Sequence, residues 1–209
     1  MWALIEDGSI TKLINNPKAM VIGDTHYSRN IFSFRWTNEE REAIGLYEIV
    51  WNNAKKKDER YYINTNQTFT YDADAGTVTA TYGDATAKAH ADTLWTQADS
   101  DNGDLPSDKS VGDVKVDGLK TIKIRTIKQQ AASELARTDW YIVRKADANT
   151  AIPSAITNHR AAVRTKCASM ETAITNASNT AAIQTLYTYT VQEDGSVTRP
   201  LGELPILES

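Results

Sequence analysis

The feature that most constrains this fold is a series of side chains that repeats every three or four residues between Ile156 and Ile174. The series consists of Ile156, His159, Val163, Cys167, Met170 and Ile174. This spacing places the side chains on one face of an α-helix, so the segment predicts an amphipathic helix with one packed face. Pro153 suits the first turn of that helix, where a missing N–H costs nothing.

Residues 119–137 form a second helix candidate, before this stripe in the chain. Its expected buried positions are Ile122, Ile127, Ala131 and Leu135, and its start carries a basic surface of Lys120, Lys123, Arg125 and Lys128. Two such helices predict an antiparallel helical hairpin. After it, Ser178 is a candidate cap for a short final helix, and Glu193-Asp194-Gly195 predicts the turn of a closing β-hairpin.

Four residues around the connection of the predicted helical hairpin are candidate site residues. Trp140 lies in the linker, where it is expected to fill the corner between the helices and bury roughly 200 Å². Arg160 and Arg164 lie on one helix face because they are four residues apart, and both are expected to reach Asp139. We interpret the group as a clamp of the hairpin, and partner docking is the alternative.

The first part of the chain shows signals of β-structure. Asp7-Gly8 separates two short apolar runs and predicts a hairpin, because glycine takes positive φ without steric cost. Thr37 and Glu40 fit a capping box that begins a short helix. Residues 60–71 and 77–82 alternate between apolar and polar side chains, which predicts antiparallel, half-buried strands.

The composition changes in the middle of the chain. Residues 85–97 are rich in alanine and predict a helix, whereas residues 99–118 hold six Asp, three Gly and one Pro. We therefore expect a β-rich module over residues 1–98, an acidic linker loop over 99–118 and a helical-hairpin module over 119–209. The expected fold class is α+β.

The bulk composition excludes several classes of protein. The net charge is −4, which disfavours nucleic-acid binding, and no apolar run is long enough to cross a membrane. The N-terminal segment carries acidic side chains where a signal peptide carries basic ones, so secretion is not expected. A single cysteine, Cys167, excludes an intrachain disulfide and fits a reducing cytoplasm.

No pattern of residues predicts catalysis, a metal or a cofactor. His26, His90 and His159 are far apart in the chain and lack metal-type spacing. The Asp-rich turns at 72–76 and 99–104 lack the twelfth-position Glu of a calcium loop, so we interpret them as solvated turns. The aromatic residues before residue 83 predict a compact core. Alternatives are an aromatic contact surface or a carbohydrate-binding module, and a small hydrolase or lyase would need a convergent polar site.

Short motifs in this chain resemble a known family. Thr138-Asp139-Trp140, Ile152-Pro153 and Arg160-Ala-Ala-Val-Arg164 are similar to the C-terminal region of tail-fibre assembly and related tail proteins of tailed bacteriophages, and residues 2–8 look like the opening of such proteins. The resemblance implies a non-enzymatic structural or adaptor protein of the virion tail, made in the host bacterial cytoplasm. Its partners would be other tail or tail-fibre proteins, and a homo-oligomer in the virion is left open. The alternative role is an assembly chaperone that is not retained in the virion.

Overall fold

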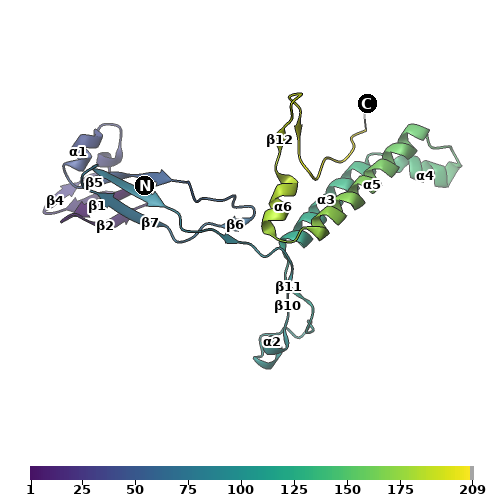
Figure 1. Ribbon diagram of the computed structural model, residues 1–209, viewed down its shortest axis with the longest axis horizontal. Coiled ribbons are helices and arrows are strands. Elements are labelled where there is room, and N and C mark those ends of the chain that lie inside the picture. The colour runs from purple at the N-terminus through teal and green to yellow at the C-terminus, as the bar shows by residue number, and fades with distance from the viewer. Residues whose placement is uncertain (208–209) are drawn as a thin grey trace. The chain divides into compact units, whose positions relative to one another are not determined.

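A computed structural model describes residues 1–207, and the chain divides into two compact units, Met1–Thr86 and Ala87–Ser209 (Figure 1). The first unit is rich in strands and the second in helices, which confirms the α+β class. The acidic composition predicts a boundary within residues 99–118. The structure instead divides the chain earlier, and this acidic segment belongs to the second unit.

A five-stranded sheet in the order β2-β1-β5-β8-β7 forms the centre of the first unit. Its strands are β1 (Trp2–Glu6), β2 (Ser9–Ile14), β5 (Leu46–Asn52), β7 (Thr68–Asp72) and β8 (Thr77–Thr81). Neighbouring strands pair antiparallel except β5 and β8, which are parallel. The predicted hairpin between β1 and β2 is confirmed, since Asp7 and Gly8 both take positive φ, at 50° and 74°.

Each face of this sheet carries a small core. Ala3 packs with buried side chains of β5 and β8 on one face, namely Ile49, Val78 and Ala80. On the other face Leu46 packs with Ile14 and Ile31, and the Trp2 ring covers them. The alternation of side chains along β1 explains this arrangement, because neighbouring residues of a strand point to opposite faces.

Short elements complete the first unit. They are β3 (Met20–Ile22), β4 (Thr25–Tyr27), the 3-10 helix η1 (Arg29–Phe32), α1 (Asn38–Glu42) and β6 (Tyr62–Ile63). The two residues of β9 (Thr86–Ala87) lie at the division between the units. Both hydrogen bonds of the predicted Thr37–Glu40 capping box are present at α1. The alternating segment 60–71 is not one strand, because β6 and β7 are separated by a turn in which Asn66 takes a φ of 57°.

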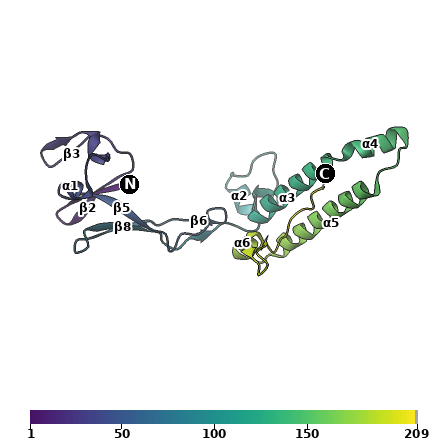
Figure 2. The ribbon, with the colours of Figure 1, turned by 90° about the horizontal axis from the view of Figure 1, so that it is seen from above.

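The second unit is built on two long helices, α3 (Leu119–Ala136) and α5 (Ser154–Asn176), which lie side by side (Figures 1 and 2). Lys120 at the start of α3 reaches the Thr175 carbonyl at the end of α5, so the helices are antiparallel as predicted. All six predicted stripe residues of α5 are buried. Four of them, Val163, Cys167, Met170 and Ile174, form one core cluster with Ile127 and Ala131 of α3. Ile122 is exposed, contrary to the predicted stripe.

Smaller elements flank these helices. They are β10 (Thr93–Leu94), α2 (Gln97–Asp101), β11 (Val114–Val116), α4 (Asp139–Ala148), α6 (Thr180–Tyr187), β12 (Thr190–Val191) and β13 (Val197–Thr198). The predicted closing hairpin is confirmed as β12–β13. The cap of α6 is Asn179 and not Ser178, because the Asn179 side chain accepts the hydrogen bond from the Ala182 N–H.

The helix predicted over residues 85–97 is wrong. This segment contains β9 and β10, and α2 begins only at its last residue. The Ala89 and His90 carbonyls accept hydrogen bonds from Leu119 and Lys120, the first residues of α3. Pairing with residues distant in sequence therefore overrides the helix propensity of alanine.

Candidate functional site

Arg160 joins the two long helices at the end where α3 stops. One terminal nitrogen of its guanidinium donates to the Leu135 carbonyl (2.7 Å), to Thr138 Oγ1 (2.7 Å) and to Asp139 Oδ1 (2.8 Å). The Arg160 side chain is only 13% exposed, and Thr138 is buried beneath it. The Leu135 carbonyl also accepts from the N–H (3.1 Å) and the hydroxyl (3.0 Å) of Thr138, so Arg160 adds a donor from α5 to a turn that is already hydrogen-bonded. Arg160 therefore holds the end of α3 and the start of α4 against α5.

Arg164 is not part of this contact. It is exposed on α5, and within residues 1–207 it forms no ion pair with Asp139. The reason is distance along the helix, since four residues raise a side chain by about 6 Å. The expectation that both arginines reach Asp139 is therefore wrong for Arg164.

Trp140 does not fill the corner between the helices. It is 51% exposed and lies on α4, a helix that the sequence does not predict. Its ring stacks on Tyr141 at 3.9 Å between centroids, and the guanidinium of Arg144 lies 5.7 Å from its centre. The helical turn at Asp139 directs Trp140 outward, while the small Thr138 side chain occupies the corner.

Helix α4 exposes large apolar side chains between charged ones. None of its ten residues is buried, although Ile142, Val143 and Trp140 are large and hydrophobic. It ends at Asn149, whose left-handed conformation at φ 50° stops the helix. Trp140 and Val143 are three residues apart and therefore share one face of α4, where they form a small exposed apolar patch. Exposed apolar patches are found at surfaces that bind other proteins.

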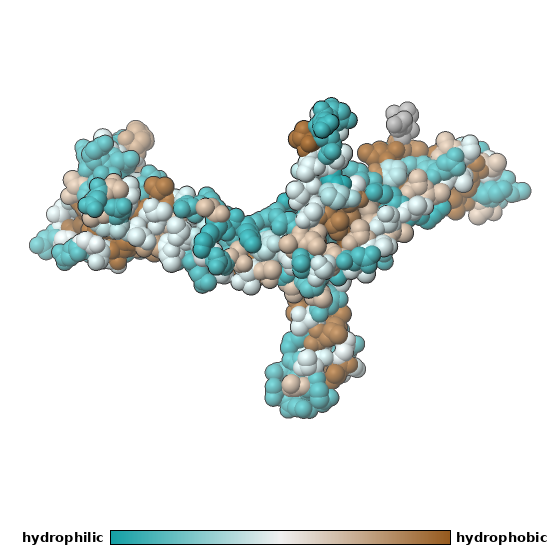
Figure 3. Space-filling view, in the orientation of Figure 1, coloured by the Kyte–Doolittle hydropathy of each residue, from teal (hydrophilic) through white to brown (hydrophobic). Residues whose placement is uncertain are grey.

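The two hairpins of the second unit also carry exposed apolar side chains. Those of β10–β11 are Leu94, Val111, Val114 and Val116, and those of β12–β13 are Tyr189, Val191 and Val197. No residue from 93 to 116 or from 188 to 198 is buried, and Val191 is 74% exposed. Hydrophobic surface is visible on both hairpins in Figure 3.

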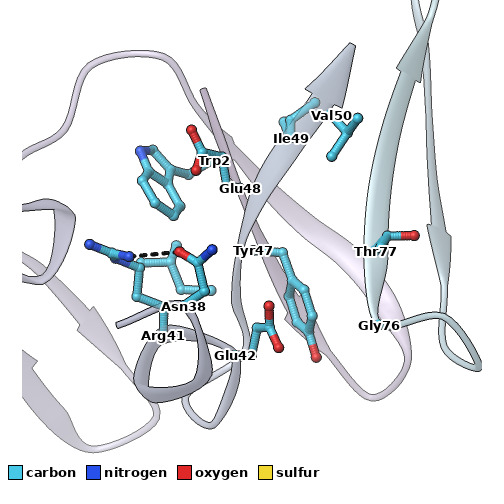
Figure 4. A pocket seen from close by; sticks show the side chains of 11 residues that line it. Trp2, Asn38, Arg41, Glu42, Tyr47, Glu48, Ile49, Val50, Gly76 and Thr77 are labelled. Atoms are coloured by element: carbon cyan, nitrogen blue, oxygen red, sulfur yellow. Dashed lines mark hydrogen bonds between the residues drawn. The ribbon is translucent and has the colours of Figure 1, made fainter. Parts of the chain in front are cut away.

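A concave pocket of about 410 Å³ opens between α1 and the sheet of the first unit (Figure 4). Buried Arg41 lies 4.9 Å from the centre of the Trp2 ring and donates to the carbonyls of Ile31 and Ser33 and to Asn38 Oδ1. Its guanidinium therefore braces η1 against α1. The exposed carboxylates of Glu42 and Glu48 also line the pocket and supply acceptors for a polar or cationic group.

Tyr47 lies in the same pocket and contacts Tyr71 across the sheet. The two hydroxyls are 3.2 Å apart. This hydrogen bond, together with burial, raises the pKa of Tyr47 to about 12. Tyr47 is therefore a neutral hydrogen-bonding group at physiological pH.

The aromatic residues of the first unit divide into core and surface. Tyr61 and Tyr62 are buried, which removes them from any sugar-binding platform. Trp51 is partly exposed and lies beside Tyr82, with centroids 5.8 Å apart and planes inclined by 32°. A hollow of about 430 Å³ next to Tyr82 has a largely apolar lining, to which Asn52, Thr68 and Thr81 also contribute.

The Asp-rich turns use their carboxylates locally. Asp72 accepts from the backbone N–H groups of Asp74 and Ala75, and Asp99 caps the start of α2. Within residues 1–207 no group of three or more His, Cys, Asp or Glu side chains converges as a metal site would.

The buried polar residues of α5 pack between the helices. His159 Nε2 lies 3.1 Å from Glu134 Oε1, without the angles of a hydrogen bond. Burial and a hydrogen bond to Glu171 raise the pKa of the Cys167 thiol. A thiol with a raised pKa is a poor nucleophile, so Cys167 serves as a small core residue.

Comparison with known proteins found no match to this chain. No protein family, no curated protein and no solved structure matched the chain. Of the helices in the described part of the chain, none is both long enough and apolar enough to cross a membrane.

Proposed function

We propose that this chain is a non-enzymatic bacteriophage tail protein, a structural or adaptor component of the tail, tail tip or tail fibre. Two lines of argument support the proposal. The motifs around Asp139 and Arg160 resemble those of tail-fibre-associated proteins, and the second unit displays apolar surface that suits protein–protein contact.

The observation that carries most weight is the exposure of the two hairpins, β10–β11 and β12–β13. An isolated two-stranded hairpin is marginally stable in water, and these hairpins bury none of their strand residues. Their valine side chains would gain free energy by packing on another chain, at about 25 cal/mol for each Å² removed from water. A protein built to assemble with others has such surfaces.

Mass spectrometry of gradient-purified virions tests this proposal. Stoichiometric presence of the chain in the particles is the expected result. Absence from particles, with abundance in the infected-cell lysate, would favour the alternative role of an assembly chaperone. If the chain were absent both from the virions and from the infected-cell lysate of every tailed phage that encodes it, any tail role would be contradicted.

A point variant tests the docking role of α4. Val143→Asp places a charge in the apolar patch and should lower the amount of the chain in virions several-fold. Its free energy of unfolding should change by less than about 1 kcal/mol, because the position is exposed. Ala161→Asp is the matched control, since residue 161 is exposed on α5 outside the patch. Equal incorporation of both variants would exclude α4 as a docking surface.

A second candidate function is glycan binding at Trp51. The partly exposed Trp51–Tyr82 pair, which lies beside a hollow with Asn52, Thr68 and Thr81 in its lining, is the observation that favours it. Titration of the purified chain with host surface glycans should then quench Trp fluorescence, and Trp51→Ala should abolish the response. An unchanged signal in the wild-type chain would remove this candidate.

A further inference from the structure

The first half of α3 carries an excess of positive charge. Residues 119–128 hold four cationic side chains, Lys120, Lys123, Arg125 and Lys128, and no carboxylate. Arg125 and Lys128 are exposed and form ion pairs with Asp117 (2.8 Å) and Glu171 (3.0 Å). Exposed ion pairs are weak, so both cations remain available to a stronger partner. Between them lies an open, largely apolar hollow of about 480 Å³ that includes Ile124.

The β10–β11 hairpin has the opposite charge. Residues 93–116, which form the hairpin, contain five aspartates and only two lysines. Asp104 and Asp108 are exposed near the tip, and within the described residues their carboxylates have no hydrogen-bond or ion-pair partner. The exposed side chain of Val111, in the segment between β10 and β11, adds apolar area there. Charge and hydrophobicity therefore both complement the surface of α3.

The root of the hairpin is fixed to the start of α3. The Asp92 carboxylate accepts from the Gly118 N–H (2.6 Å) and from Thr121 Oγ1 (2.8 Å). Leu119 and Lys120 add two backbone hydrogen bonds to residues 89 and 90. From this root the hairpin extends away from α3, with α2 at its far end (Figure 1). Its tip is therefore displayed to another molecule and does not cover the basic surface of its own chain.

We propose that the acidic tip of the hairpin in one copy of this chain docks on the basic α3 surface of the next copy. A second copy fits better than a nucleic acid, because the acidic hairpin and the net charge of −4 repel a polyanion. The contact joins two different surfaces, so it is head-to-tail and generates a ring or a filament. This inference rests on the proposed function and specifies one of its partners.

A charge-swap experiment on the full chain tests the contact. One variant carries Arg125→Glu with Lys128→Glu, and the other carries Asp104→Lys with Asp108→Lys. Sedimentation velocity should show oligomers of the wild type at low salt that dissociate at about 1 M salt, where the Debye length is about 3 Å. Each variant alone should self-associate at least about tenfold more weakly. An equimolar mixture should regain oligomers, because both contacts between unlike variants are then attractive.

Controls separate charge pairing from other effects. Lys12→Glu with Lys18→Glu makes the same change of charge at exposed positions of the first unit and should leave the oligomers intact. Circular dichroism verifies folding, and Arg125→Gln with Lys128→Gln replaces any variant that fails to fold. A monomeric wild type, oligomers unaffected by the swaps, or a mixture that stays monomeric would each overturn the contact. The contact would also be overturned if the charge-swap variants lost co-purified nucleic acid but kept their oligomers. None of these results alters whether the chain is found in virions, so the proposed function is judged separately.

Discussion

Gly118 occupies the tightest backbone approach in the second unit. A Cβ atom at this position would lie 2.3 Å from the carbonyl carbon and oxygen of Ala91. Since both are backbone atoms, Gly118→Ala must displace the root of the β10–β11 hairpin. We expect it to lower the free energy of unfolding by about 2 kcal/mol or more in urea denaturation.

Gly8→Asn is the control for this substitution. A Cβ atom at Gly8 would meet no atom within 4 Å, and asparagine tolerates the φ of 74° at this turn better than most residues. The effect of Gly8→Asn should stay within roughly 0.5–1 kcal/mol. If Gly118→Ala were as stable as Gly8→Asn, the backbone of residues 89–92 would have shifted at little cost in free energy.

Arg160 and Arg164 provide a matched pair on one face of α5. Arg160→Leu removes three hydrogen bonds at a nearly buried site, and we expect a loss of about 2–3 kcal/mol in the free energy of unfolding. Arg164→Leu should change it by no more than about 0.5 kcal/mol, because Arg164 is exposed. Equal losses in thermal denaturation would contradict the clamp.

At the scale of elements, α2 and β11 depend on one carboxylate. The Lys115 ammonium, followed by the hydroxyl and N–H of Thr96, lowers the pKa of Asp99 to about 2 from its ordinary 3.8. A lowered pKa in the folded chain means that the ionised form stabilises the structure above about pH 4. This contribution is lost as the pH falls from about 4 to 2.

NMR of the Thr96 and Lys115 amides measures this loss. Their chemical shifts should change between about pH 4 and 2 in the wild type, and Asp99→Asn should show the low-pH shifts already at about pH 6. Asp101→Asn is the control, because the Asp101 carboxylate accepts from the Gln97 side chain within α2. Shifts that are flat down to about pH 2 in the wild type would contradict the role of Asp99.

Periodic patterns in the sequence predict the elements that bury a face. The stripe of α5 is correct because burial against α3 demands one side chain every three or four residues. The same pattern misplaces Ile122, which lies on the exposed side of α3, whereas Ile127 and Ala131 are buried. Capping signals at Thr37 and turn signals at Asp7-Gly8 are also correct, because they act between neighbouring residues.

The sequence does not predict elements whose conformation is set by residues distant in the chain, or elements whose side chains are exposed. Residues 85–97 have helical composition, yet hydrogen bonds with Gly118 and Leu119 decide their conformation. Helix α4 has no buried residue, so its sequence shows no periodic apolar pattern that would predict it. For this reason Trp140 is predicted to lie in a core, whereas the structure exposes it. In the candidate site, the predicted Arg160–Asp139 contact is present, but the same helical spacing wrongly includes Arg164, and the role of Thr138 has no sequence signal.

At the scale of the whole molecule, the division into two units predicts independent folding. Two overlapping fragments test this. Fragment 1–88 contains the whole of β9, and fragment 87–209 retains the hydrogen bond from Thr180 to the Lys88 carbonyl. Each should unfold cooperatively with a midpoint within a few degrees of its transition in the full chain, measured by calorimetry. An insoluble or unfolded fragment would show that one unit requires the other.

The single buried cysteine has a practical consequence for the study of assembly. Cys167 is the only thiol in the chain, and its burial and raised pKa make it slow to react with maleimides or methanethiosulfonates. A cysteine introduced at an exposed position, such as Ser107→Cys near the hairpin tip, would therefore accept a spin label or fluorophore at one place only. Distances between labels on neighbouring copies would then report directly on the geometry of any oligomer that the chain forms.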